Sequence, residues 1–243
     1  MQRLPIARTR NWIRFIVLAA PAIGMQARAG VTVQEVPSTE GQVNYIRQSD
    51  FGSAQIGGPP PSPWLCSKPG EKARVFIETP PGHPATERWV RLVDNSDKES
   101  ANIHESFAPV TSGRFQARVI SNKAGGRLFF NLGNGGASKP EERALQLIIG
   151  TDGSLEVHGG RKARSSMLIK TGEVYLVRCD FEPSDNGNGF RVRTELVEEN
   201  TQQENHLETE IPTQLAISAV RVTSTTADTG VDFYVTGVSL TSR

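Results

Sequence analysis

Short segments of alternating polar and apolar residues, separated by turn residues, follow one another through most of the chain. Within residues 88–120, the segments 89–93 and 114–120 alternate in this way, and polar residues fill the bends between them. A period of two is typical of β-strands with one buried face. Asp152-Gly153 lies between two further segments of this kind, and Asp-Gly favours a tight hairpin turn. No stretch shows a convincing amphipathic helical pattern, so the sequence predicts an all-β protein.

The number and spacing of these segments indicate a β-sandwich. About a dozen short strands with turns roughly every eight to twelve residues favour a jelly roll of two antiparallel sheets. A chain of 243 residues with 37% hydrophobic residues can form one such domain with a sizeable core. We therefore expect a single jelly-roll β-sandwich over residues 43–243, preceded by a short extended arm over residues 30–42.

The first 29 residues have the pattern of a secretory signal peptide. Four arginines and no acidic residue occur in residues 1–14, an apolar run follows over residues 15–25, and Ala27-Arg28-Ala29 matches a signal-peptidase site. An uncleaved membrane anchor is the alternative, but the apolar run is shorter than the roughly 20 residues that span a bilayer. The sequence predicts cleavage after Ala29, a secreted or periplasmic protein, and no membrane span after cleavage.

Removal of this segment changes the charge balance. The chain has 27 basic and 26 acidic residues, and residues 1–29 contain five arginines and no acid, which leaves 22 basic and 26 acidic residues. The mature domain is therefore mildly acidic. Nucleic-acid binding depends on clustered basic residues that neutralise phosphates, so we expect no nucleic-acid partner.

The two cysteines, Cys66 and Cys179, predict one disulfide, because compartments outside the cytoplasm are oxidising. The alternative is that Cys179 is a free, buried thiol. It shares the apolar face of a predicted strand with Tyr175, Val177 and Phe181, where a thiol would pack well.

A family resemblance follows from six segments in their order along the chain. They are SDFGSAQIGGPPPSPW, RWVRLVDNS, ESFAPVTSGRFQARV, LIIGTDGSLEV, GEVYLVRCDFEP and VDFYVTGVSL. This order, over roughly residues 43–243, resembles the concanavalin A-like lectin/glucanase superfamily, in particular the LamG-like domains of secreted bacterial proteins. The resemblance implies a lectin-like, often glycan-binding module, which sometimes holds structural calcium.

Catalytic motifs of this superfamily do not occur in the sequence. The E-x-D-x-x-E run of related glucanases, which supplies two carboxylates, is absent. Arg193-Thr194-Glu195-Leu196 matches one alginate-lyase element by its letters, but it comes late in the chain and the other elements are missing. A polysaccharide lyase or glycoside hydrolase with a divergent site stays an alternative, and the lack of a paired acid and base favours binding.

The positive functional signal is a set of polar residues on strand faces. Side chains alternate along a strand, so neighbouring strands could gather them on one donor-rich surface. The guanidinium groups of arginines on such a surface could form paired hydrogen bonds with the carboxylates or sulfates of an acidic polysaccharide. The alternative is an ordinary solvent-facing side of the sandwich. The residues are Arg114, Gln116, Arg118, Arg127, Asn131, Gln146, Arg178, Arg191 and Arg193.

Three aspartates are candidate ligands of a structural calcium ion, which prefers oxygen ligands. Asp50 lies near the first strand, Asp94 at a turn and Asp232 on the last strand. Capping of its own turn is the alternative role of Asp94. Taken together, the sequence predicts a secreted, non-catalytic glycan-binding module, with a catalytic module or a structural or protein-binding envelope domain as the alternatives.

Overall fold

The computed structural model describes residues 44–68, 70–225 and 230–242. The expected signal segment over residues 1–29 and the expected arm over residues 30–42 lie outside these ranges. Within them the chain forms fifteen strands and one short 3-10 helix, η1 (Pro140–Glu142). No described helix is long and apolar enough to span a bilayer. The prediction of an all-β fold is confirmed.

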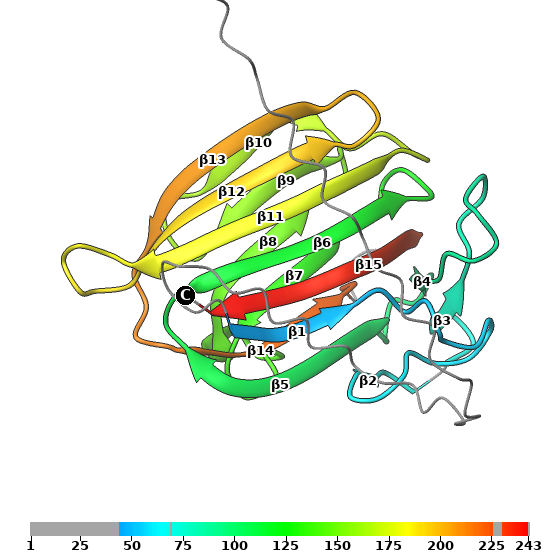
Figure 1. Cartoon of the computed structure of the whole chain (residues 1–243), viewed down its shortest axis with the longest axis horizontal. Coiled ribbons are helices and arrows are strands. Elements are labelled where there is room, and N and C mark those ends of the chain that lie inside the picture. Colours follow the sequence, from blue (N-terminus) through cyan, green and yellow to red (C-terminus); the bar gives the residue numbers. More distant parts are fainter. Residues whose placement is uncertain (1–43, 69, 226–229, 243) are drawn as a thin grey trace, which may run out of the picture. The chain divides into compact units, whose positions relative to one another are not determined.

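The strands form two antiparallel sheets that stack as a sandwich (Figure 1). The eight-stranded sheet has the order β13 (Gln203–Ile211), β12 (Phe190–Glu198), β11 (Val174–Pro183), β6 (Gly113–Ser121), β15 (Val231–Ser242), β4 (Trp89–Asp94) and β3 (Ala73–Glu78), and β1 (Asn44–Ser49) also pairs with β15. The seven-stranded sheet has the order β10 (Ala163–Leu168), β9 (Ser154–His158), β8 (Arg143–Ile149), β7 (Leu128–Gly133), β14 (Ile217–Thr223), β5 (Asn102–Val110) and β2 (Leu65–Cys66).

The core lies between the sheets and is built by the alternation that the sequence shows. In β6, Phe115, Ala117 and Val119 are fully buried, whereas the residues between them face outward. The ring of Phe115 meets that of Phe130, from the other sheet, at a centroid distance of 5.6 Å. Full burial of such a side chain is worth about 2–3 kcal/mol, so pairs of this kind hold the two sheets together.

A bulge divides β15 into two halves. The register of β15 against β6 shifts between Thr236 and Ser239, and Gly237 there has φ +59°. Before the bulge β15 pairs with β4, and after it the same edge pairs with β1. The bulge therefore allows one edge of this long strand to pair with two different strands. It also places Thr236 and Gly237 beside an open part of the outer face.

The expected disulfide is not formed, because the fold places the two cysteines far apart. Both are free: Cys179 is buried in β11, and Cys66 lies in β2 at the edge of the other sheet. Cys66 lies close to β3, since both line one pocket. In the eight-stranded sheet β3 is four strand positions away from β11, the strand that holds Cys179. At about 4.8 Å per strand this separation is far greater than the roughly 7 Å between Cα atoms that a disulfide tolerates.

Candidate functional site

The nine residues predicted to bind carbohydrate lie on both outer faces of the sandwich. Arg127, Asn131 and Gln146 belong to the seven-stranded side, where Asn131 and Gln146 lie opposite each other on β7 and β8. The other six lie on β6, β11 and β12 of the eight-stranded sheet. They are Arg114, Gln116, Arg118, Arg178, Arg191 and Arg193. Because the core separates the two faces, the nine do not form one surface.

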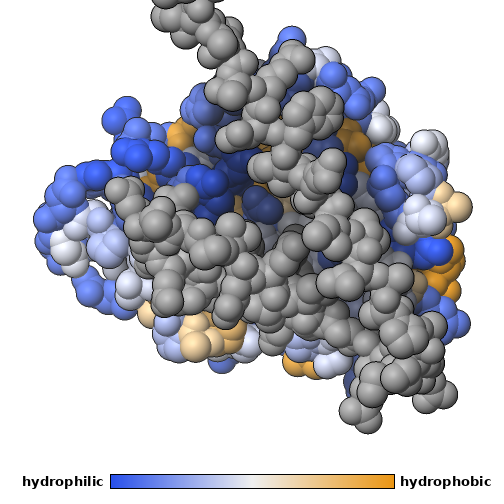
Figure 2. Space-filling view, viewed as in Figure 1, coloured by the Kyte–Doolittle hydropathy of each residue, from blue (hydrophilic) through white to orange (hydrophobic). Residues whose placement is uncertain are grey.

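Each predicted arginine of the eight-stranded sheet has a carboxylate partner. The carboxylate of Asp180 accepts two hydrogen bonds of 2.7 Å from Arg114, and that of Glu199 does the same for Arg118. The three further ion pairs are Arg178–Glu195, Arg191–Asp185 and Arg193–Glu208. Hydrophilic residues prevail in the coloured part at the upper left of Figure 2, with a few hydrophobic ones between them, and each of these five arginines is paired with a carboxylate. Such a face offers a polyanion little general attraction.

The seven-stranded sheet holds a pocket of different character, which we call the arginine pocket. It is a cavity of about 350 Å³ on the outer face, where β14, β7 and β8 lie side by side. The two charged residues that line it, Arg143 and Arg221, are both cationic. The other lining residues are hydroxyl, amide or aromatic: Ser100, Phe129, Asn131, Ser138, Gln146, Thr223, Ser224 and Thr225.

Neither arginine of this pocket forms an ion pair with a carboxylate of the described residues. Arg221 donates from Nε to the carbonyl oxygen of Gly136 at 2.9 Å and from Nη1 to Oδ1 of Asn102 at 2.8 Å. Arg143 donates from Nη2 to the carbonyl oxygen of Ser138 at 2.7 Å, and its buried Nε has no partner. Among the described residues, no acidic side chain lies within 4.0 Å of either guanidinium. Both arginines therefore keep unused donors.

The electrostatics of the pocket follow from burial. Burial lowers the pKa of Arg221, and the charge of Arg143 lowers it further, while Glu142 opposes this from beyond ion-pair distance. Burial also lowers the pKa of the neighbouring His104, as does the charge of Arg221, so His104 stays neutral near pH 7. The pocket therefore carries two positive charges, and the described residues of its walls supply no close counter-charge.

The loop between β7 and β8 forms one wall of this pocket. Its fold is fixed by Glu142, whose carboxylate accepts from the backbone nitrogen of Ser138 at 2.9 Å and from that of Lys139 at 3.2 Å. These hydrogen bonds lower the pKa of Glu142 and hold it away from ion-pair contact with Arg221. Gly133 is required here, because a Cβ atom would lie 1.9 Å from the carbonyl oxygen of Glu142.

Two amides line the arginine pocket beside the guanidinium groups. Nε2 of Gln146 donates to Oδ1 of Asn131 at 2.7 Å, so the amide pair is held in one orientation. The sequence identified both residues, each from the alternation of its own strand, but it did not pair them with each other. It missed Arg143 and Arg221, although Arg221 stands between Val220 and Val222 with the same outward alternation. The alternation of apolar and polar residues in β14 would have indicated that Arg221 faces outward.

A second hollow, which we call the tryptophan cleft, lies on the outer face of the eight-stranded sheet. Its volume is about 570 Å³, and Gln116, Arg118 and Arg178 line it together with Asp50 and Trp89. The further lining residues are Gly52, Thr86, Glu87, Arg88, Leu176, Glu199, Thr236 and Gly237. This cleft gathers three of the predicted carbohydrate-binding residues.

The three aspartates predicted to bind calcium are not brought together. Asp94 is buried and accepts from Ser96 N and Ser224 Oγ, which is the role of a turn cap. Asp232 forms a two-bond ion pair with Arg91, at 2.9 and 2.8 Å. Oδ1 of Asp50 accepts from Gly52 N at 3.1 Å in an exposed loop. Within the described ranges, no three His, Cys, Asp or Glu residues cluster as metal ligands would.

Similarity to known proteins is found in the fold and not in the sequence. No family model and no curated protein matches it. Among solved structures, a sialidase matches with 15% identity and a TM-score of 0.58, over 80% of this chain and 18% of that chain. A legume lectin-like domain from Entamoeba histolytica matches with 11% identity and a TM-score of 0.50, over 73% of this chain and 87% of that chain.

These similarities concern the fold. The structure is a concanavalin A-like jelly-roll sandwich, as the sequence predicted. The chain spans less than a fifth of the sialidase chain. The narrower assignment to LamG-like domains stays a prediction.

Proposed function

We propose that this protein is a glycan-binding, lectin-like module outside the cytoplasm, and that its arginine pocket recognises the acidic group of a sugar. The observation that carries the proposal is that, among the described residues, Arg143 and Arg221 bond neutral oxygen atoms and no carboxylate. The likeness in fold to a legume lectin-like domain supports it as a second, weaker argument.

The physical reason is the cost of burying charge. A guanidinium that leaves water without a counter-ion loses hydration that neutral carbonyl groups restore only in part. A carboxylate or sulfate placed against the unused donors of Arg143 and Arg221 would supply charge-assisted, two-point hydrogen bonds. We therefore infer that an anionic ligand completes a pocket which the protein alone leaves electrostatically unbalanced.

The size and lining of the pocket suit a sugar that carries such a group. A volume of about 350 Å³ lies at the lower end of small-molecule pockets, which suits one or two sugar rings. Hydroxyl groups of Ser138 and Thr223 and the amide of Gln146 can bond ring hydroxyls, and Phe129 adds an apolar surface. The proposed ligand is a uronate or a sulfated sugar within a polysaccharide.

Four carboxyl groups of the described residues do not suit the acid role that glycoside hydrolysis requires. Glycoside hydrolysis requires a carboxylic acid that stays protonated, which means a raised pKa. The pKa values of Glu87, Glu142, Glu156 and Glu198 are lowered, so these four carboxyl groups are poor proton donors. Burial raises the pKa of Tyr234 to about 12, so this tyrosine is a poor proton donor or acceptor for a lyase.

The test compares an acidic ligand with its uncharged methyl ester. Oligogalacturonate and its fully methyl-esterified form are titrated calorimetrically into the purified full-length protein. We expect the acidic form to bind and the ester to bind at least tenfold more weakly, because esterification removes the charge-assisted hydrogen bonds, worth about 1.5–3 kcal/mol each. Sulfated oligosaccharides are the parallel probe. Failure of every acidic and sulfated probe to bind would reject the proposal and favour a structural domain.

A matched pair of variants locates the site. Arg143→Met should weaken binding of the acidic probe at least tenfold, because it removes one guanidinium and a single hydrogen bond to Ser138. Arg193→Met is the control, since Arg193 is exposed, lies on the opposite sheet and has its own partner, Glu208. Melting curves confirm that both variants fold. Equal losses in the two variants, or none in Arg143→Met, would contradict the assignment.

A further inference from the structure

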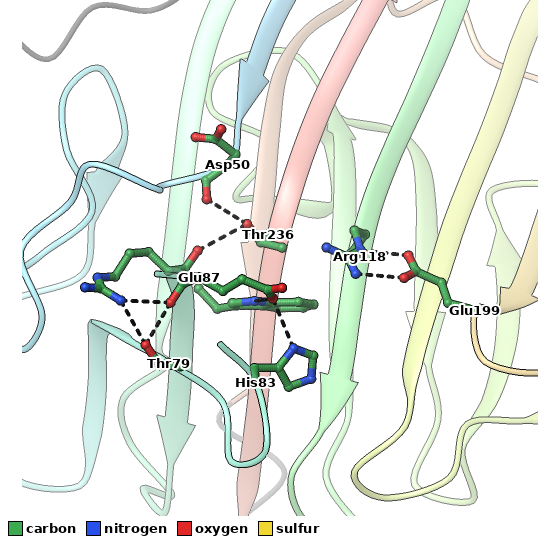
Figure 3. A network of polar contacts seen from close by, with 9 residues as sticks. Asp50, Thr79, His83, Glu87, Arg118, Glu199 and Thr236 are labelled. Carbon is green, nitrogen blue, oxygen red and sulfur yellow. Dashed lines mark hydrogen bonds and ion pairs between the residues drawn. The ribbon is translucent and has the colours of Figure 1, made fainter. Parts of the chain in front are cut away.

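The walls of the tryptophan cleft are held rigidly by contacts among themselves (Figure 3). Trp89 is almost fully buried, and its Nε1 donates to Oε2 of Glu87 at 3.1 Å. The guanidinium of Arg118 lies over the indole ring, 5.1 Å from its centroid, and is fixed by Glu199. His83 touches the same ring edge-on at 5.5 Å and bonds Glu87 at 3.0 Å. A cleft with fixed walls loses little conformational entropy when a ligand binds.

The charged residues in and around this cleft give it no net positive charge. Three arginines stand against three carboxylates, and Glu195 outside the lining neutralises one of the arginines, Arg178. Hydrogen bonds from Trp89 and His83 outweigh the effect of burial and lower the pKa of Glu87, which therefore stays ionised. The cleft thus differs from the arginine pocket, because it presents many polar groups without a net positive charge.

Some hydrogen-bonding groups of the cleft have no partner within the part of the chain that the structure describes. The amide of Gln116 bonds none of the described residues, although it lines the cleft. Directly across from it on β11 lies Arg178, whose Nε is buried and has no acceptor. A buried donor without an acceptor costs about 1–3 kcal/mol, which a ligand oxygen would recover. Leu176, next to Arg118 in register, adds an apolar patch beside these donors.

We propose that the tryptophan cleft is a second ligand site, which binds an uncharged, hydroxyl-rich sugar chain through Gln116 and the free donor of Arg178. Its volume of about 570 Å³ accommodates a few sugar rings. The two sites lie on opposite outer faces of the sandwich, so both can be occupied at once. One domain would then hold an acidic and a neutral glycan together. This proposal does not depend on the function assigned to the arginine pocket.

The experiment titrates the full-length protein with neutral hexasaccharides of β-1,4-glucose, β-1,3-glucose, β-1,4-xylose and β-1,4-mannose. We expect at least one to bind, and Gln116→Ala to weaken that binding at least fivefold. Gln116→Glu keeps the shape but removes two N–H donors, and it should weaken binding as well. Gln203→Ala is the matched control, because Gln203 is an exposed glutamine at the far edge of the same sheet.

The outcomes separate the two proposals. Arg143→Met should leave binding of the neutral hexasaccharide unchanged, and Gln116→Ala should leave binding of oligogalacturonate unchanged. Protein captured on an oligogalacturonate surface should still bind the neutral chain with the same affinity. If none of the four hexasaccharides binds, or if Gln116→Ala and Gln116→Glu bind like the parent protein, the second site is refuted, whatever the acidic probes show.

Discussion

Arginine has two different roles in this protein, and its neighbours decide which. Arg118 is satisfied by Glu199, a residue 81 positions away in the sequence. Arg221 is half-buried and bonded to a carbonyl oxygen and an amide oxygen. Exposed pairs such as Arg193–Glu208 contribute about 0–1 kcal/mol to stability. The arginines without acids are therefore the better candidates for ligand binding.

The two cysteines permit a direct test at the residue scale. Burial raises the pKa of the Cys179 thiol to about 12, and the thiolate is the reactive form, so Cys179 should be inert in the folded protein. Cys66 is partly exposed. Without reductant, we expect N-ethylmaleimide to add once to the native protein, at Cys66, and twice after unfolding, as read by mass spectrometry. A protein that takes up no reagent after unfolding would instead contain the disulfide.

At the scale of elements, the bulge in β15 forms part of the wall of the tryptophan cleft. β15 changes its partner from β4 to β1 at Gly237, and Thr236 and Gly237 both line the cleft. The hydroxyl group of Thr236 donates to the carbonyl oxygen of Asp50 at 3.1 Å, which ties the loop after β1 to the bulge. A bulge of this kind redirects side chains locally without interrupting the sheet.

Gly237→Ala tests the conformation of the bulge. The added methyl group would find ordinary contact distances of 3.6 Å to Arg118, so the cost comes from φ +59°, which is unfavourable for a residue with a Cβ atom. We expect the free energy of unfolding to fall by about 1–2 kcal/mol in denaturant titrations. Gly52→Ala, at a glycine that borders the same cleft without a positive φ, should change it by less than about 0.5 kcal/mol. Equal effects of the two substitutions would contradict the role given to the bulge.

At the scale of the whole molecule, one continuous core joins the two sheets and keeps their outer faces independent. Core residues from both sheets are fully buried, among them Phe115, Phe130, Leu147 and Val177. The arginine pocket and the tryptophan cleft lie on opposite sides of this core. A change on one outer face should therefore reach the other only through the packing of the core.

Phe130→Ala tests the contact between the sheets. Removal of a fully buried ring that meets Phe115 should lower the free energy of unfolding by about 3–5 kcal/mol, because the cavity adds to the lost transfer energy. Leu168→Ala is the control at a 49% exposed position and should cost less than about 0.5 kcal/mol. Thermal and denaturant unfolding measure both. A loss below 1 kcal/mol in Phe130→Ala would mean that the sheets are not held together by this packing.

The alternation of polar and apolar residues was sufficient to predict the all-β class, the sandwich and much of the core. It also predicted that Gln116, Arg118 and Arg178 face outward and that Asn131 and Gln146 do so as well. These properties could be predicted because the direction of a side chain from a strand is a local property with a period of two.

The tertiary structure alone decided which outward residues meet. It separated Gln146 from Arg118 by the thickness of the core, matched Arg118 with Glu199, and left Arg221 without an acid. It also kept Cys66 away from Cys179. The physical reason is that strand order and ion pairing depend on contacts between segments distant in the sequence, whereas alternation along one strand reports only which side of its sheet a residue occupies.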